Sequence, residues 1–402
     1  MTTAVTVRPT DRFPALDGMR ALACYAVLAT HVGFETAQSF GSGWLAPWLS
    51  RLDTAVPIFF GLSGFLLYRP FVKQAFAGGP PLHVVDFYGR RALRVLPAYS
   101  VMLTVTLGLL TTRHASAGDW FAYSSLTQIY SGHDVDPSLT PIWTLAVEIS
   151  FYLLLPPLAL ATRWRGDTPE QVLVRQCALI AVLVLGTVVW DVISFRVSSL
   201  RFTATTWLPG TFDWFAIGML FAIFSCVPAG CAALRGLRRV LTEWAHAPGL
   251  CWTAALVLYW LVTLPLAGPL NLDRPTAWQQ ISKNLLEGAV VFFMMLPLTV
   301  GHSRVLGHIL GNRVSRFLGQ ISYGVYLWHV PMLILIQREV GLPIFQGRYW
   351  EFFVLTAASS TLLGTLSWYL VERPLLRRFS RPWRPSISVP STTRQIPVTQ
   401  RT

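Results

Sequence analysis

The most regular feature of the chain is a series of apolar runs, each close to the roughly 20 residues that a helix needs to cross a bilayer. We count ten such runs, several of them interrupted by Gly or Pro. They cover residues 15–36, 53–72, 95–113, 140–162, 177–195, 206–226, 247–266, 283–300, 318–338 and 350–371. This pattern predicts an all-α, polytopic integral membrane helix bundle of about ten transmembrane helices, in one domain over residues 15–376.

Positive charge between the runs predicts their orientation. With the N-terminus in the cytoplasm, 23 of the 32 Lys and Arg residues fall on the inner side and eight on the outer side, which is the bias that cytoplasmic loops carry. We therefore expect both termini in the cytoplasm and a multi-pass location in the inner (plasma) membrane. Residues 1–14 would form a cytoplasmic N-terminal segment without a cleaved signal peptide. Residues 377–402, basic and rich in Ser, Thr and Pro, would form a disordered cytoplasmic tail.

Composition supports this class of protein and excludes others. Hydrophobic residues make up 53% of the chain and charged residues 13%, about half the charged share of a soluble domain. The net charge of +13 lies in short clusters between apolar runs, which argues against nucleic-acid binding. The five cysteines lack metal-ligand spacing, so we expect neither a metal site nor a disulfide framework.

The first apolar run contains three ionisable residues, Asp17, Arg20 and His31. Arg20 and His31 are eleven positions apart, or about three helical turns, so they share a face about 16 Å apart along the axis. Asp17 precedes Arg20 by three and can pair with it. Ionisable groups are costly in a bilayer and need a partner or a function. Taken alone, the three residues could be a capped helix entry and a packed histidine.

Three further runs place polar groups at a similar depth. A rise of 1.5 Å per residue puts His31 about 22 Å, and Glu148 and His329 about 18 Å, from the cytoplasmic edge of a core about 30 Å thick. Ser63 lies about 10 Å below the outer face by the same rise. This layer predicts a site closer to the outside than to the inside. Purely structural roles remain open as alternatives. Glu148 could form an ion pair that joins helices, and His329 could donate a hydrogen bond in helix packing. Ser63, beside Gly64, could allow a close contact between helices.

An arginine cluster precedes the third run. Arg90, Arg91 and Arg94 are three or four positions apart in the segment FYGRRALRVLPAY, so their side chains are neighbours on a helix. Such a cluster satisfies the positive-inside bias or contacts anionic lipid. Guanidinium groups also hold phosphates bidentately, which is the functional alternative.

Six segments stand out in order along the chain: DGMRAL with the following R-x(10)-H, FFGLSGFLL, RRALRVLPAY, PIWTLAVEISFYL, GQISYGVYLWHVP and YLVERP. Together they resemble the successive motifs of the acyltransferase 3 family of ten-helix membrane proteins. The resemblance runs from about Phe13 to Leu376, and it implies O-acylation, commonly O-acetylation, of carbohydrates, glycolipids or secondary metabolites by cytoplasmic acyl-CoA. It also implies that Arg20 and His31 are the family's catalytic pair and that Arg91 and Arg94 hold the acyl-CoA phosphates. We expect a stand-alone domain, without the extracytoplasmic hydrolase-like domain of some members.

These observations lead to a mechanistic hypothesis. Acyl-CoA would be a cosubstrate rather than a bound cofactor, with its phosphates on Arg90, Arg91 and Arg94 and its thioester near His31. His31, as a neutral imidazole, would remove the alcohol proton, and Glu148 would orient it as the carboxylate of a triad does. The remaining pocket residues would shape the site or donate to an oxyanion: Ser63, Trp143, Tyr323 and His329.

The acceptor would arrive from the outside as an envelope sugar, a glycolipid or a secreted metabolite, and the other expected contacts are membrane lipids. The sequence leaves the oligomeric state open. The main alternative is a transporter or flippase of an envelope precursor, which also places polar groups at mid-depth. That alternative consumes no CoA and does not explain the arginine cluster or the R-x(10)-H arrangement.

Overall fold

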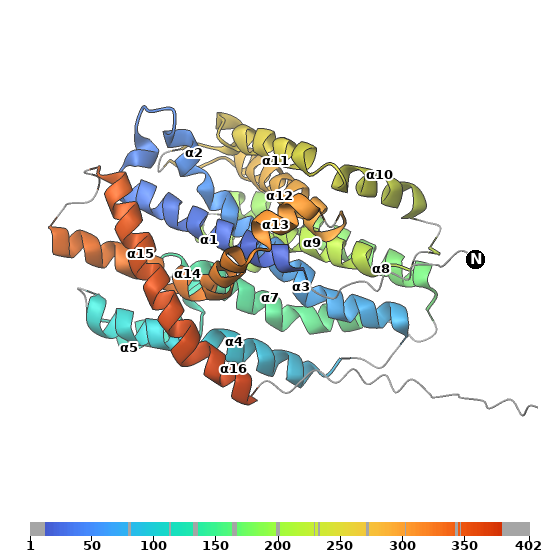
Figure 1. Ribbon diagram of the computed structural model, residues 1–402, viewed down its shortest axis with the longest axis horizontal. Helices are drawn as coiled ribbons and strands as arrows, with labels where there is room; N and C mark the ends of the chain where they lie inside the picture. The colour runs from blue at the N-terminus through green and yellow to red at the C-terminus, as the bar shows by residue number, and fades with distance from the viewer. Residues whose placement is uncertain are drawn as a thin grey trace, which may run out of the picture.

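The computed structural model describes residues 13–78, 82–111, 114–131, 136–162, 167–197, 202–228, 230–231, 234–270, 273–301, 303–341, 345 and 347–379. Every regular element in these ranges is helical (Figure 1), so the predicted all-α class is confirmed. The predicted N-terminal segment and C-terminal tail lie almost wholly outside the described residues.

Ten longer helices overlap the ten predicted runs. They are α1 (Pro14–Glu35), α3 (Ala55–Ala77), α4 (Val84–Val105), α7 (Ile142–Ala161), α8 (Pro169–Arg196), α9 (Leu208–Cys226), α11 (Pro248–Val262), α12 (Ala277–Thr299), α14 (Arg313–Val340) and α15 (Tyr349–Ser367). The shorter helices are α2 (Ala46–Ser50), α5 (Ala117–Ser124), α6 (Gln128–Ser131), α10 (Arg235–Ala245), α13 (Arg304–Leu310) and α16 (Arg373–Phe379). Short turns include η2 (Leu52–Thr54) and the π-helical turns η3 (Thr106–Leu110) and η8 (Trp368–Glu372).

The number of helices suited to crossing a membrane is smaller than the predicted ten. Within the described residues, eight helical stretches are long and apolar enough, and a ninth is added if α10 and α11, bent by 89°, form one broken span. The predicted run that is absent from this set is α1, which carries Asp17, Arg20 and His31. These polar residues lower the hydropathy of α1 below that of a typical span.

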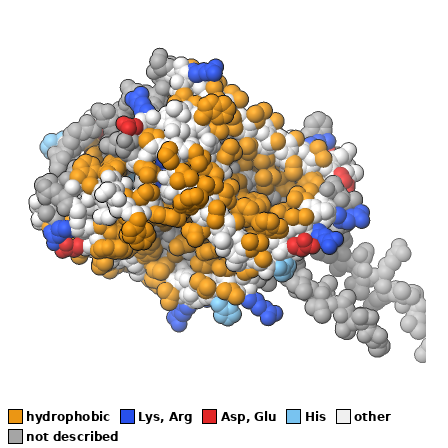
Figure 2. Space-filling model, turned by 90° about the horizontal axis from the view of Figure 1, so that it is seen from above, with side chains coloured by type: hydrophobic (Ala, Val, Ile, Leu, Met, Phe, Trp, Pro, Cys, Tyr) orange, Lys and Arg blue, Asp and Glu red, His pale blue; other side chains and the backbone are white. Residues whose placement is uncertain are grey.

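The bundle tolerates a polar α1 because other helices enclose it. α1 packs against α3, α13, α14 and α15, and it runs through the middle of the molecule (Figure 1). Hydrophobic side chains cover most of the surface seen in Figure 2, and charged side chains lie mainly toward its margins. A polar helix surrounded by apolar helices can keep ionisable groups away from lipid.

Glycines allow α3 and α9 to pack closely against each other. A Cβ added at Gly64 would collide with the backbone carbonyl of Phe215, and one added at Gly218 would collide with the carbonyl of Gly61. Small residues permit this approach of two backbones. The expected packing role of Gly64 is therefore confirmed, and the contact fixes the face of α3 that carries Ser63.

Candidate active site

The main feature inside the bundle is a cavity of about 270 Å³ between α1, α3, α4, α7 and α14. Its wall includes six of the ten predicted site residues, namely Arg20, Ser63, Arg91, Arg94, Glu148 and Tyr323. Tyr152 and Tyr326 complete its polar lining, with Thr144 and Ser322. Segments that are far apart in the sequence thus bring three arginines and a carboxylate to one cavity.

Two hydroxyl groups hold the carboxylate of Glu148. The Ser63 hydroxyl donates to Oε1 at 2.6 Å and the Tyr152 hydroxyl donates to the same oxygen at 2.7 Å. Tyr152 lies one helical turn after Glu148 on α7, and Ser63 comes from α3. This arrangement gives Ser63 a hydrogen-bonding role as well as a place in the helix contact. It leaves Oε2 of Glu148 without a hydrogen bond from the described residues.

Arg20 and Arg94 both line the cavity, and each forms an ion pair at its wall. Arg20 Nη1 lies 3.3 Å from Asp17 Oδ1, as the spacing predicts. Arg94 Nη1 lies 3.0 Å from Glu372 Oε2, and the Glu372 side chain is only 1% exposed. The Arg94 guanidinium also lies over the Trp368 ring, 5.2 Å from its centroid. The π-helical turn η8 therefore supplies both groups that hold Arg94 in place.

Arg91 is the least constrained of the three arginines. Its Nε is buried, and none of the described residues accepts a hydrogen bond from it. Most buried donors in proteins are paired, and a guanidinium has five N–H donors in a fixed plane. Arg91 therefore retains donor capacity at the cavity wall for an anionic group.

Two predicted residues lie outside the cavity lining. Arg90 is on the same helix as Arg91, where its charge interacts with that of Asp86, but it does not line the cavity. Trp143 packs edge-on against Phe60, with ring centroids 6.3 Å apart, and the neighbouring Thr144 lines the cavity in its place. The helical phase explains both differences, because a shift of one residue turns a side chain by about 100°.

Two histidines lie side by side next to the cavity. The ring centroids of His31 on α1 and His329 on α14 are 5.2 Å apart, so the predicted meeting of these residues is confirmed. His329 is 1% exposed, whereas His31 is only partly buried. Neither residue lines the cavity directly. Tyr326, which does, has its ring centroid 5.3 Å from that of His329.

The hydrogen bond of His329 determines its tautomer. His329 Nδ1 lies 2.6 Å from the backbone carbonyl oxygen of Tyr326. A carbonyl only accepts, so Nδ1 carries the proton and donates it, and the neutral ring has its lone pair on Nε2. His329 Nε2 is buried and has no partner among the described residues. The ring therefore offers a hydrogen-bond acceptor in the interior of the bundle.

The structure favours one of the two roles expected for Tyr323, and it corrects the expected partner of Glu148. The Tyr323 hydroxyl donates to the Val95 carbonyl at 2.8 Å, so it shapes the cavity rather than offering a free proton to an oxyanion. Glu148 makes no hydrogen bond with His31; its recorded partners are Ser63 and Tyr152. The carboxylate whose charge acts on His31 is Asp53, just before α3.

Five polar residues of this site were not predicted, and the sequence contains a signal for two of them, Tyr152 and Glu372. The other three are Thr144, Ser322 and Tyr326. Tyr152 stands four positions after Glu148, the spacing that pairs side chains on a helix. Glu372 is an acidic residue at the end of an apolar run, within the segment YLVERP. Its pairing with Arg94, 278 positions away, depends on tertiary packing and has no local signal.

The chain is similar to known membrane proteins over most of its length. The acyltransferase domain that defines the acyltransferase 3 family matches residues 13–371. YrhL of Bacillus subtilis is 27% identical over 399 residues, covering 92% of this chain and 56% of the relative. The peptidoglycan O-acetyltransferase OatA of Listeria monocytogenes is 25% identical over 397 residues, covering 90% and 55%. The O-acetyltransferase OatA of Staphylococcus aureus is 21% identical over 385 residues, covering 91% and 57%.

The chain spans a little over half the length of each of these relatives. No solved structure matches the sequence. The comparisons therefore bear on the transmembrane part that the relatives share with this chain.

Proposed function

The chain belongs to the acyltransferase 3 family, and from this premise we propose that it is a membrane O-acyltransferase. The reaction would move an acyl group, commonly acetyl, from acyl-CoA to a hydroxyl of a cell-envelope polymer such as peptidoglycan. The observation that carries the proposal is the cavity that Arg20, Arg91 and Arg94 line together with Glu148, beside a histidine pair.

Acyl-CoA recognition would use the positive charge of this cavity. Three guanidiniums line it with one carboxylate, Glu148, and two of them are already oriented by Asp17 and Glu372. Guanidiniums bind phosphate oxygens through paired N–H donors. A volume of about 270 Å³ is too small for a whole CoA and suits its narrow pantetheine arm, with the phosphates toward the arginines.

The transfer step needs a base for the acceptor and a stabilised oxyanion. In the proposed reaction the acceptor oxygen attacks the thioester carbonyl while its proton passes to His31. The C–S bond then breaks, CoA leaves as a thiolate that takes up the proton from His31, and the ester remains on the acceptor. His329 Nε2 would accept a hydrogen bond from the protonated His31 or from the acceptor.

A genetic experiment tests the proposal. A strain lacking this gene should lose ester-linked acyl groups from an envelope glycan, and the wild-type gene should restore them. The His31→Ala gene should fail to restore them, whereas His308→Ala, a change at an exposed histidine of α13, should succeed. Mass spectrometry of the released glycans measures the result. Unchanged ester content in the deletion strain would contradict the proposal.

A further inference from the structure

The cavity has two chemically different ends, and α7 shows where each of them lies. Tyr152, Glu148 and Thr144 all line the cavity, and they stand four positions apart, on one face of this helix. At 1.5 Å per residue, Thr144 and Tyr152 lie about 12 Å apart along the helix axis. The cavity therefore extends along α7 from Tyr152 to Thr144, with Glu148 between them.

The arginines gather at the Tyr152 end of the cavity. Tyr152 interacts electrostatically with Arg20 and Arg91, and Arg20 interacts in the same way with Arg94. The proposed function places the phosphates of acyl-CoA on these guanidiniums. The acyl group of a bound donor would therefore point away from them, toward Thr144.

Mainly apolar side chains line the Thr144 end of the cavity. The Tyr326 hydroxyl lies 2.8 Å from that of Thr144, and the Phe59 ring packs edge-on against the Tyr326 ring with centroids 5.8 Å apart. Val56 and Phe60 line the cavity beside Phe59, at positions that share one face of α3. We call these five residues the apolar end of the cavity. Its surface suits a hydrocarbon chain better than a charged group.

The apolar end borders the histidine pair. The ring centroid of Tyr326 is 5.3 Å from that of His329, which in turn is 5.2 Å from that of His31. A thioester beside Tyr326 would thus lie next to the proposed base, with the rest of its acyl chain directed at Phe59. The same geometry serves the transfer step and limits the space behind the carbonyl carbon.

Two of the aromatic rings at this end are held firmly in place. The Tyr326 hydroxyl lies 2.8 Å from the Thr144 hydroxyl and 3.2 Å from the Pro141 carbonyl oxygen, both at the start of α7. Phe60 is 2% exposed and stacks on Phe215 with centroids 4.5 Å apart. Phe59 is only partly buried although it packs against Tyr326. Its ring is therefore the part of the end wall that an acyl chain would meet.

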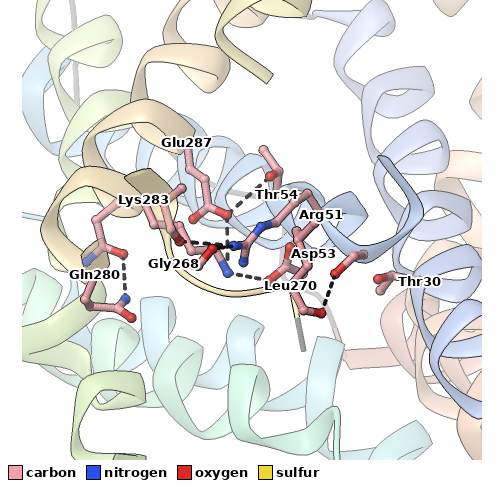
Figure 3. Close-up of polar contacts among 12 residues, drawn as sticks. Thr30, Arg51, Asp53, Thr54, Gly268, Leu270, Gln280, Lys283 and Glu287 are labelled. Carbon is pink, nitrogen blue, oxygen red and sulfur yellow. Dashed lines mark hydrogen bonds and ion pairs between the residues drawn. The ribbon is translucent and has the colours of Figure 1, made fainter. Parts of the chain in front are cut away.

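Ion contacts fix the start of α3, the helix that carries Phe59 (Figure 3). Lys283 Nζ lies 2.5 Å from Asp53 Oδ2, and the Thr54 hydroxyl donates to Glu287 Oε1 at 3.2 Å. Asp53 and Thr54 directly precede α3, whereas Lys283 and Glu287 belong to α12. A shift of α3 that lengthened the apolar end would break these contacts, so the end wall is rigid.

We propose that Phe59 sets the length of the acyl group that the cavity accepts, and that the donor is a short-chain acyl-CoA, acetyl or propionyl. This inference rests on the proposed acyltransferase function and names a specificity-determining residue for it. A longer acyl chain overlaps the Phe59 ring or displaces it from Tyr326. An apolar pocket of this kind discriminates by about 10-fold to 200-fold for one methylene group.

The test compares donors with the purified full chain in lipid nanodiscs. The donors are acetyl-, propionyl-, butyryl- and hexanoyl-CoA, and the acceptor is the glycan fraction that muramidase releases from bacterial cell walls. Glycan-dependent release of CoA thiol gives kcat/KM for each donor. Wild-type kcat/KM should be at least about 10-fold lower for butyryl-CoA than for acetyl-CoA. Phe59→Ala should raise the butyryl-to-acetyl ratio about 10-fold or more, and Phe59→Trp should lower the propionyl-to-acetyl ratio by a similar factor.

The matched control is Phe292→Ala on α12. This ring is also partly buried, and it stacks on Phe221 with centroids 5.2 Å apart, but it does not line the cavity. Its removal lowers stability without changing the butyryl-to-acetyl ratio. Phe59→Leu covers the case in which Phe59→Ala fails to fold, and it should raise the same ratio by a smaller factor.

The outcomes separate the role of Phe59 from the proposed function. A wild-type ratio in folded Phe59→Ala or Phe59→Leu overturns the role of Phe59. Equal wild-type kcat/KM for hexanoyl-CoA and acetyl-CoA overturns the short-chain donor class. Absence of transfer from every donor by the wild-type protein overturns the proposed function itself.

Discussion

At the scale of single residues, the buried carboxylates of the bundle have different roles. Glu148 binds two hydroxyls inside the cavity, Glu372 holds Arg94, and Asp53 is the acid whose charge acts on His31. Depth along a helix predicted that Glu148 and the histidines lie near one another. It could not predict which carboxylate faces which ring, because that depends on the rotation of each helix about its axis.

Replacing Glu148 by Gln tests whether its charge matters. The amide oxygen can still accept from Ser63 or Tyr152, so the fold should persist, but the negative charge facing the cavity arginines is lost. We expect kcat for acyl transfer to fall about 10²-fold, in the range for a lost electrostatic contact at an active site. Glu339→Gln, at a side chain that is 68% exposed, is the control and should keep wild-type kcat. Equal kcat values for the two variants would exclude a role for the charge of Glu148.

The arginines differ in a way that kinetics can measure. Arg91→Ala removes a guanidinium with free donor capacity at the cavity, so the KM for acetyl-CoA should rise about 10-fold to 100-fold, the cost of losing a hydrogen bond to a charged group. Arg90→Ala removes the same charge from the same helix, one position outside the cavity lining, and should change this KM less than threefold. If both changes raise the KM equally, the cluster acts only through its overall charge.

At the scale of elements, the sequence predicts helices better than it predicts their ends and irregular turns. All ten apolar runs are helical, yet α4, α8 and α12 begin several residues earlier than predicted, because their first turns contain charged or polar residues that a hydropathy pattern excludes. The π-helical turn η8 follows α15, and Pro374 stands two positions after its end. Because a proline has no backbone N–H, it cannot donate to the carbonyl four residues earlier, which lies in this turn. Trp368 and Glu372 of the turn both contact Arg94.

The α3–α9 contact yields a stability prediction. Gly64→Ala places a methyl group against the Phe215 carbonyl, and overpacking of this kind costs about 1–3 kcal/mol. We expect the apparent melting temperature of the protein in detergent to fall by several degrees. Gly186→Ala, on α8 with open space around it, should keep or slightly raise the melting temperature. Equal melting temperatures for both variants would mean that the close approach is dispensable.

At the scale of the whole molecule, the fold class and part of the cavity lining were predictable from the sequence, and the ion cluster of Arg51, Asp53, Lys283 and Glu287 was not. The depth argument grouped His31, Ser63, Glu148 and His329, of which Ser63 and Glu148 line the cavity and the two histidines lie beside it. Arg51, Asp53 and Lys283 stand at the ends of the apolar runs, where charged residues are common in loops. Only the folded chain shows that they converge with Glu287 beside α1.

The orientation of the chain is also a property of the whole molecule. The distribution of Lys and Arg predicts that both termini lie in the cytoplasm. A green fluorescent protein fused after Thr402 should therefore fluoresce in a bacterial host, and an alkaline phosphatase fused at the same position should be inactive. Phosphatase fused within the loop between α11 and α12 should be active. The reverse pattern would place the arginines of the cavity toward the outside and contradict the route proposed for acyl-CoA.

The most direct test of the central claim is acyl transfer by the purified chain. Wild-type protein in nanodiscs, incubated with radiolabelled acetyl-CoA and a cell-wall glycan fraction, should release CoA thiol and place an equal amount of base-labile label on the glycan. His31→Ala should reduce both by at least 100-fold, and His308→Ala should leave both unchanged. Label transfer that persists in folded His31→Ala protein, or thiol release without labelled glycan in the wild type, would contradict the account.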